Sequence, residues 1–149
     1  MTSSAHRPSQ QAIELTIEQL RYWIPSIKDV ARVYEGMEGE SWLLSIEPHV
    51  GAACAVAVEI RDTGLFDIAI AGETYEALPL PPSDDIVHLL DRISAGYVIQ
   101  RRWLSPITGA LQCVETLVDL GPDEIWRGGP PPLDGGERRD RHFLAYRRA

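Results

Sequence analysis

The side chains best suited to catalysis or metal binding in this sequence are its histidines and cysteines, namely His6, His49, His88, His142, Cys54 and Cys113. None of them has the short spacing to another that zinc ligands show. A thiol nucleophile needs a nearby histidine base, but both cysteines lie in apolar runs that predict burial, and buried thiols are normally inert. We therefore predict no catalytic residue, no metal and no cofactor, and two core cysteines without a disulfide.

Two pairs of carboxylates could act as general acid and base, Asp84 with Asp85 and Asp123 with Glu124. The first pair follows Ser83 at the start of a predicted helix, where acidic side chains favour the positive end of the helix dipole. The second pair follows Pro122, and we expect it to cap a turn in the same way. Neither pair therefore requires a catalytic role.

Arginine and tryptophan occur together at Arg101, Arg102 and Trp103, in a chain that is poor in basic residues. In a strand, Arg101 and Trp103 share one face and Arg102 points to the other. Both residue types are enriched at binding hot spots, so one interpretation is a patch that binds a partner. The other is structural, with Arg102 paired to acidic residues of the body and Trp103 packed in the core.

The last thirteen residues, from Glu137, carry five arginines and two acidic residues, a net charge of +3. Three interpretations stay open for this tail. It binds a partner, it folds back on the acidic body, or it is a frayed terminus. Candidate partner-binding residues in the tail are Arg138, Arg139, Arg141, Phe143 and Tyr146.

Charge and hydropathy exclude several classes of protein. Residues 1–136 hold nine basic and twenty acidic residues, a net charge of −11, which disfavours nucleic-acid binding and suits a basic protein partner. No run approaches the roughly 20 apolar residues that cross a bilayer, and the N-terminus lacks an apolar signal core. We expect a cytoplasmic protein that binds another protein, with a homodimer as one option.

The elements that position these residues follow from periodicity. Apolar residues at helical spacing predict a helix over residues 83–96, ended by Gly96. Two β-prone runs, residues 97–104 and 111–118, predict a hairpin. Strict alternation predicts three earlier strands, around Trp42–Ile46, Cys54–Ile60 and Phe66–Ile70, with Tyr75–Leu78 as a short extension.

Near the N-terminus, Thr16 and Gln19 resemble a capping box that opens a helix running to Pro25. Residues 26–36 continue an apolar side and predict either a second short helix or a continuation of the first helix, kinked at Pro25. The resulting order is α(α)-β-β-β-α-β-β, an α+β fold with a single antiparallel sheet of about five strands and helices on one face. We expect a loose lead-in over residues 1–11, one domain over 12–126, and a Gly/Pro-rich linker with the arginine tail over 127–149.

The sequence shows no set of residues with the spacing of a catalytic site, and its body is acidic. Both features favour a non-enzymatic protein-interaction module, such as an immunity protein, a chaperone or a small complex subunit. The alternative is a small enzyme or ligand-binding domain with a pocket between sheet and helices, lined by His88, Asp67, Tyr97 and Cys113. A third hypothesis, nucleic-acid binding through the tail, requires strongly salt-dependent binding.

Overall fold

The structure, a computed structural model, describes residues 10–130 and 136–147. In these ranges it has two α-helices, one short 3-10 turn and nine strands. Their bounds are α1 Gln10–Trp23, η2 Ile24–Ser26, β1 Ala31–Glu38, β2 Ser41–Pro48, β3 Val56–Ile60, β4 Leu65–Ile70, β5 Glu73–Pro79, α2 Asp85–Ser94, β6 Val98–Leu104, β7 Leu111–Gly121, β8 Glu124–Gly128 and β9 Glu137–His142.

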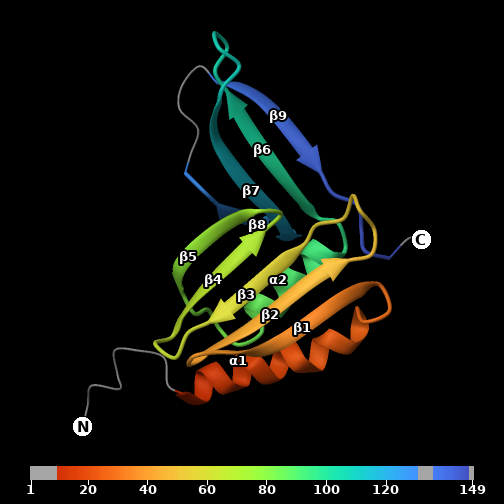
Figure 1. The fold of residues 1–149 in the computed structure, drawn as a ribbon, viewed down its shortest axis with the longest axis vertical. Coiled ribbons are helices and arrows are strands. Elements are labelled where there is room, and N and C mark those ends of the chain that lie inside the picture. The colour runs from red at the N-terminus through yellow and green to blue at the C-terminus, as the bar shows by residue number, and fades with distance from the viewer. Residues whose placement is uncertain (1–9, 131–135, 148–149) are drawn as a thin grey trace.

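The strands form two antiparallel sheets, so the α+β class is confirmed but the single sheet is not (Figure 1). The first sheet has the order β1-β2-β3-β4-β5, and the second has the order β8-β7-β6-β9. Proline-rich residues 79–82 end β5, and α2 follows directly. These prolines explain the end of β5. The hairpin after α2 belongs to the second sheet because β6 pairs with β7 and β9 and with no strand of the first sheet.

Residues 26–36 are not a second helix, because most of them belong to strand β1. Val33 pairs with Ile46 of β2, and the turn between the two strands uses Gly39 at a φ of +63°. The apolar residues Val30, Val33 and Tyr34 have the i, i+3, i+4 spacing of a helix and lack the alternation of a strand. Contact with β2, which the local pattern does not contain, selects the strand.

The first helix also begins earlier than its predicted cap. It starts at Gln10, so most of the lead-in expected for residues 1–11 lies outside the described residues. Thr16 is buried inside the helix, where its hydroxyl donates a hydrogen bond to the carbonyl of Ala12, 3.0 Å away. A threonine that bonds back along its own helix does not cap it.

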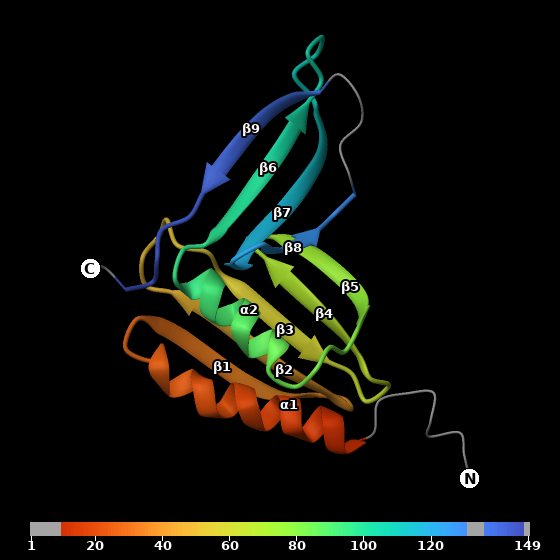
Figure 2. The same ribbon diagram turned by 180° about the vertical axis from the view of Figure 1, so that it is seen from behind.

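Both helices cover the same face of the five-stranded sheet (Figure 2). The alternation in β2, β3 and β4 is confirmed, and Ile60 pairs with Phe66 across the β3–β4 turn as the pattern predicts. The predicted stripe of α2 is buried on this face. The core side chains of these elements are Trp42, Leu44, Ile46, Val56, Val58, Ile60, Phe66, Ile68, Ile70, Ile86, Leu89, Leu90 and Ile93.

The second sheet is attached to this core only at its base. The side-chain amide of Gln100 donates to the carbonyl of Ile70, 2.9 Å away, and the hydroxyls of Tyr75 and Thr116 are hydrogen-bonded at 2.6 Å. Val98 and Val118 are buried beside these contacts. Beyond this base, β6, β7 and β9 extend away from the five-stranded sheet (Figure 1). The far half of this sheet therefore stands apart from the core.

Candidate functional site

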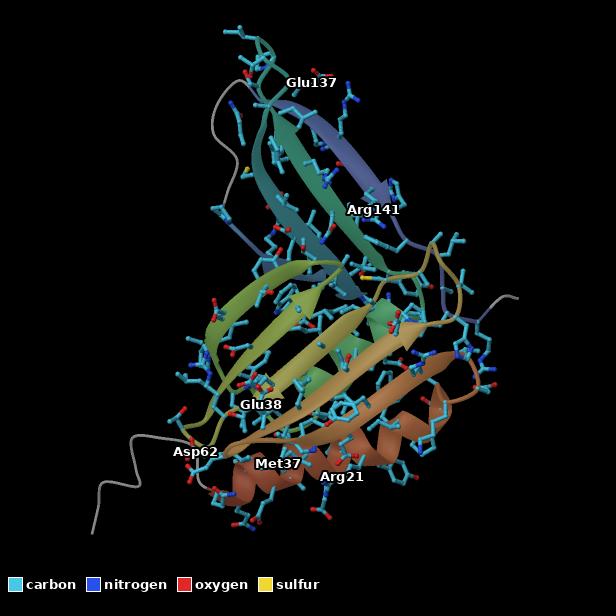
Figure 3. All side chains as sticks on the ribbon, in the orientation of Figure 1. Arg21, Met37, Glu38, Asp62, Glu137 and Arg141 are labelled. Carbon is cyan, nitrogen blue, oxygen red and sulfur yellow. The ribbon has the colours of Figure 1, made fainter. Side chains whose placement is uncertain are left out.

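The arginine tail and the hairpin arginines come together in the second sheet. Residues 137–142 form β9, which pairs antiparallel with β6, so Trp103 lies beside Arg138 and Arg102 beside Arg139. Figure 3 shows this strand between Glu137 and Arg141. Two stretches far apart in sequence thus make one surface, which we call the arginine surface: Arg101, Arg102, Trp103, Arg138, Arg139 and Arg141.

One face of the arginine surface carries three cations. Arg102 shares a face with the buried Gln100, and its cross-strand partner is Arg139. Arg141 lies two residues along β9 from Arg139 on this face, with its guanidinium 4.6 Å from the ring centre of Phe143. Like charges directly opposite in a sheet are destabilising. Arg139 has one anionic neighbour on this face, Glu137 at 3.5 Å, whereas Arg102 makes no ion pair with a described residue. This face therefore keeps an excess of positive charge.

The opposite face is closer to charge balance. Asp140 lies between two arginines, with its carboxylate 3.7 Å from Nε of Arg101 and 3.4 Å from Nε of Arg138. Trp103 shares this face with Arg101, as its position in the strand predicts. Nε of Arg101 and Nε1 of Trp103 are both buried without a hydrogen-bond acceptor in the described residues. Unsatisfied buried donors are costly, so this face is also not optimised for the isolated fold.

Phe143 and Tyr146, the two aromatic residues expected at a partner surface, lie in the core instead. Phe143 is 6% exposed and Tyr146 3%. The Tyr146 hydroxyl donates to the carbonyl of Cys54, and burial raises the pKa of this tyrosine. Arg147 forms two hydrogen bonds of 2.8 Å to the carboxylate of Asp29. In the structure, the described part of the tail therefore folds back on the body, which is the second of the three interpretations.

The two cysteines are free and differ in environment. Cys54 is fully buried, and burial raises the pKa of its thiol to about 12, so the thiol stays protonated at neutral pH. Cys113 was expected to be buried as well, but it is half-buried beside Trp103 on the second sheet. The reason is that this part of β7 has no core beneath it.

We predict that the two thiols react differently with an alkylating reagent. In the native protein at pH 8, iodoacetamide should modify Cys113 and leave Cys54 unmodified, because only the thiolate is nucleophilic and Cys54 is protonated and inaccessible. Peptide mass spectrometry measures both sites, and denatured protein serves as the control in which both react. Equal modification of Cys54 and Cys113 in the native protein would contradict the buried position of Cys54.

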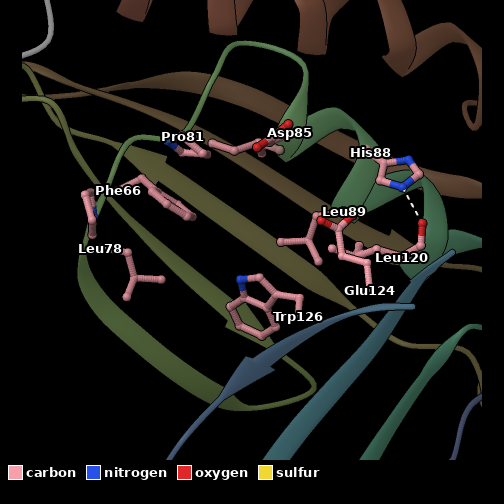
Figure 4. A pocket seen from close by; sticks show the side chains of 11 residues that line it. Phe66, Leu78, Pro81, Asp85, His88, Leu89, Leu120, Glu124 and Trp126 are labelled. Atoms are coloured by element: carbon pink, nitrogen blue, oxygen red, sulfur yellow. Dashed lines mark hydrogen bonds between the residues drawn. The ribbon is translucent and has the colours of Figure 1, made fainter. Parts of the chain in front are cut away.

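A second candidate site is a pocket at the N-terminal end of α2 (Figure 4), with a volume of about 300 Å³. We call it the α2 pocket; its lining residues are Phe66, Leu78, Pro79, Pro81, Asp85, Ile86, His88, Leu89, Leu120, Glu124 and Trp126. Four residues were expected to line a pocket between sheet and helices, and only His88 does so here. Asp67 is bound to Arg61, while Tyr97 and Cys113 belong to the second sheet or its edge.

His88 is held in place at the rim of this pocket. Its Nε2 lies 2.6 Å from the carbonyl of Leu120, and because a carbonyl only accepts, Nε2 carries the hydrogen. Sequence patterns did not indicate the remaining lining residues, since they come from β4, β5, α2, β7 and β8. Among these remaining residues, the sequence pattern draws attention only to Asp85 and Glu124, as members of carboxylate pairs that capping explains.

Within residues 10–130 and 136–147, no three His, Cys, Asp or Glu side chains come together as they would around a metal ion. No helix in these ranges is long and apolar enough to cross a membrane. His6 and Arg148 lie outside the described residues.

Comparisons with known proteins give no family for this chain. No protein-family model matches it, and neither a curated protein nor a solved structure does. The functional conclusions below therefore depend on the geometry of the two candidate sites.

Proposed function

We propose that this protein is a non-enzymatic protein-interaction module that binds a partner through the arginine surface. The observation that supports this most strongly is the pairing of β9 with β6, which gathers six candidate residues on a sheet that projects from the body. Tryptophan and arginine are the residue types that dominate binding hot spots. An immunity protein, a chaperone and a small complex subunit are the versions of this proposal that we carry forward.

The chemistry of the arginine surface favours an acidic partner segment. Arg102, Arg139 and Arg141 share one face, and carboxylates of a partner would relieve the repulsion between Arg102 and Arg139. A partner with a basic surface, expected from the acidic body alone, would have to bind elsewhere. Nucleic acid competes for the same arginines, but the net charge of −11 on residues 1–136 opposes it.

The proposal is tested by reversing charge on this surface. We expect the double variant Arg102→Glu/Arg139→Glu to bind the partner about tenfold more weakly or worse. The new glutamates would face the carboxylates of the acidic partner, and juxtaposed like charges cost several kcal/mol. The two substituted residues remain a like-charged pair, and the only ion pair lost among the described residues is the exposed one between Arg139 and Glu137, so stability should fall by about 1 kcal/mol or less. Affinity capture from native lysate of the source organism, after nuclease treatment, with quantitative mass spectrometry measures the effect.

The matched control is Lys28→Glu/Arg32→Glu, which changes the net charge equally on exposed residues near the β1 end of the first sheet. A partner recovered by the wild type and this control, and lost by the Arg102→Glu/Arg139→Glu variant, supports the proposal. Equal recovery by all three proteins would refute it. Recovery that disappears on nuclease treatment would assign the arginines to nucleic acid instead.

The alternative function, ligand binding in a pocket between sheet and helices, has one observation in its favour. The α2 pocket exists and combines an apolar floor with polar groups, as ligand sites do. It shares no residue with the arginine surface.

A further inference from the structure

The α2 pocket has the size of a site for one large side chain. Its volume of about 300 Å³ lies at the lower end of the range for small-molecule sites. Phe66 of β4, Leu78 of β5, Leu89 of α2 and Trp126 of β8 surround it from different directions (Figure 4). Phe66 and Leu89 belong to the buried core. The floor is therefore rigid and apolar, suited to an aliphatic or aromatic group.

Two carboxylates border this apolar space. Asp85 lies in the first turn of α2, and Glu124 is the first residue of β8. Neither side chain forms a hydrogen bond or ion pair with another described residue. Asp85 occupies the first turn of α2, where the helix dipole favours a carboxylate, while the N-cap residue Asp84 makes no side-chain cap hydrogen bond. Both carboxylates are exposed and border the apolar cavity without a cationic partner among the described residues.

The pocket also contains a free hydrogen-bond donor. The Trp126 ring packs edge-on against Tyr75, with ring centres 5.7 Å apart and planes at 73°. Its indole nitrogen has no acceptor among the described residues, and in Figure 4 the nitrogen edge points into the pocket. This nitrogen is reached by solvent, since the buried unpaired donors of the described residues are Arg101 Nε and Trp103 Nε1. It is therefore available to an acceptor on a bound molecule.

We propose that the α2 pocket binds the arginine or lysine side chain of an extended peptide. The aliphatic stem would lie on Phe66, Leu78 and Leu89, and the cationic end would pair with Asp85 and Glu124. A peptide carbonyl would accept the hydrogen bond from the Trp126 indole. The negative potential of residues 1–136 would attract such a peptide over a long range. This site is independent of the arginine surface, because the two share no residue.

Binding is measured by NMR titration of the Trp126 indole N–H resonance, assigned by its loss in Trp126→Phe. The probe is a capped five-residue peptide with one central arginine between alanines. Its matched control carries citrulline, which has the shape of arginine without the charge. We expect the arginine peptide to shift this resonance and the citrulline peptide to leave it unchanged. Equal shifts from both peptides, or none at millimolar concentration, would overturn the proposal.

Two isosteric variants test the carboxylates. Asp85→Asn and Glu124→Gln should each lower the affinity for the arginine peptide by about tenfold or more. This is the usual effect of losing a hydrogen bond to a charged group. Glu18→Gln, on an exposed position of α1, has the same change of charge and should bind like the wild type. Unchanged affinity in both pocket variants would overturn the assignment.

A third arm distinguishes a peptide from a free organic cation. N-acetylarginine amide presents the same side chain with little backbone, so it should bind more weakly than the peptide. If it binds as tightly, the occupant is a small cation and the peptide assignment is refuted. These outcomes do not depend on the arginine surface, whose variants should bind the arginine peptide normally.

Discussion

Replacing Tyr146 by alanine is expected to lower the free energy of unfolding by about 3–5 kcal/mol, the magnitude found for aromatic truncations in a core. Tyr146 is 3% exposed, its hydroxyl donates to the carbonyl of Cys54, and its amide donates to the carbonyl of Ser94, 2.8 Å away. Truncation removes this packing and leaves a buried carbonyl without its donor. Urea denaturation followed by circular dichroism measures the change.

The neighbouring Leu144 provides the control. Its side chain is 52% exposed, although its backbone pairs with Ala53, so Leu144→Ala should cost less than about 1 kcal/mol. Tyr146→Phe, which removes only the hydroxyl, should fall between the two alanine variants. If Tyr146→Ala were no more destabilising than Leu144→Ala, the C-terminal segment would be frayed in solution, and its place in the core would be wrong.

Gly96→Ala is expected to destabilise the protein by about 2–5 kcal/mol, for two reasons that add. Gly96 follows α2 with a φ of +90°, where a side chain costs about 1–2 kcal/mol. A Cβ at this position would also lie 2.9 Å from the backbone nitrogen of Ala145, and overpacking of this kind costs a further 1–3 kcal/mol. The neighbouring atoms belong to backbone, so they cannot rotate away. Thermal and urea unfolding both report the loss.

Gly109 separates these two contributions. It also has a positive φ, +74°, but a Cβ there would meet no atom within 4 Å. Gly109→Ala should therefore cost only the conformational part, about 1–2 kcal/mol. Equal effects at the two glycines would mean that the C-terminal segment does not pass close to Gly96. A double variant of Gly96→Ala with Tyr146→Ala should cost less than the two single changes together, because loosening the segment relieves the clash.

Both experiments concern the same structural feature, the segment that follows β9. Phe143, Leu144 and Tyr146 attach it to the core, to the loop before β3 and to the end of α2. This attachment holds β9 next to β6 and so assembles the arginine surface. We therefore expect Tyr146→Ala to weaken partner capture as well as stability, without affecting peptide binding in the α2 pocket while the protein stays folded.

Local sequence patterns were sufficient to predict the elements in which apolar residues recur with the period of the element and face the core. The alternation in β2, β3 and β4 identified the buried side of the first sheet, because a strand shows alternate side chains to a core. The apolar stripe of α2 and the left-handed Gly96 behind it were equally local. The hairpin of β6 and β7 followed from its turn residues.

The same patterns failed where a strand carries no alternation. All six residues of β9 are exposed, and all six are charged or basic in type, so its composition is that of a tail. Its strand character exists only through backbone pairing with β6, which a local sequence pattern does not record. In β1 the apolar residues have the spacing of a helix, and pairing with the neighbouring β2 overrides that local pattern.

The α+β class, the buried faces of the central strands and of α2, and the residue types available for binding all follow from local sequence. The tertiary fold divides the strands into two sheets, buries Phe143 and Tyr146 in the core, and sets Arg102 beside Arg139. It also brought Asp85, Glu124 and Trp126 around one cavity. The physical reason is the same in each case, since these contacts join residues far apart in the chain, whereas periodicity reports only how each segment meets the core.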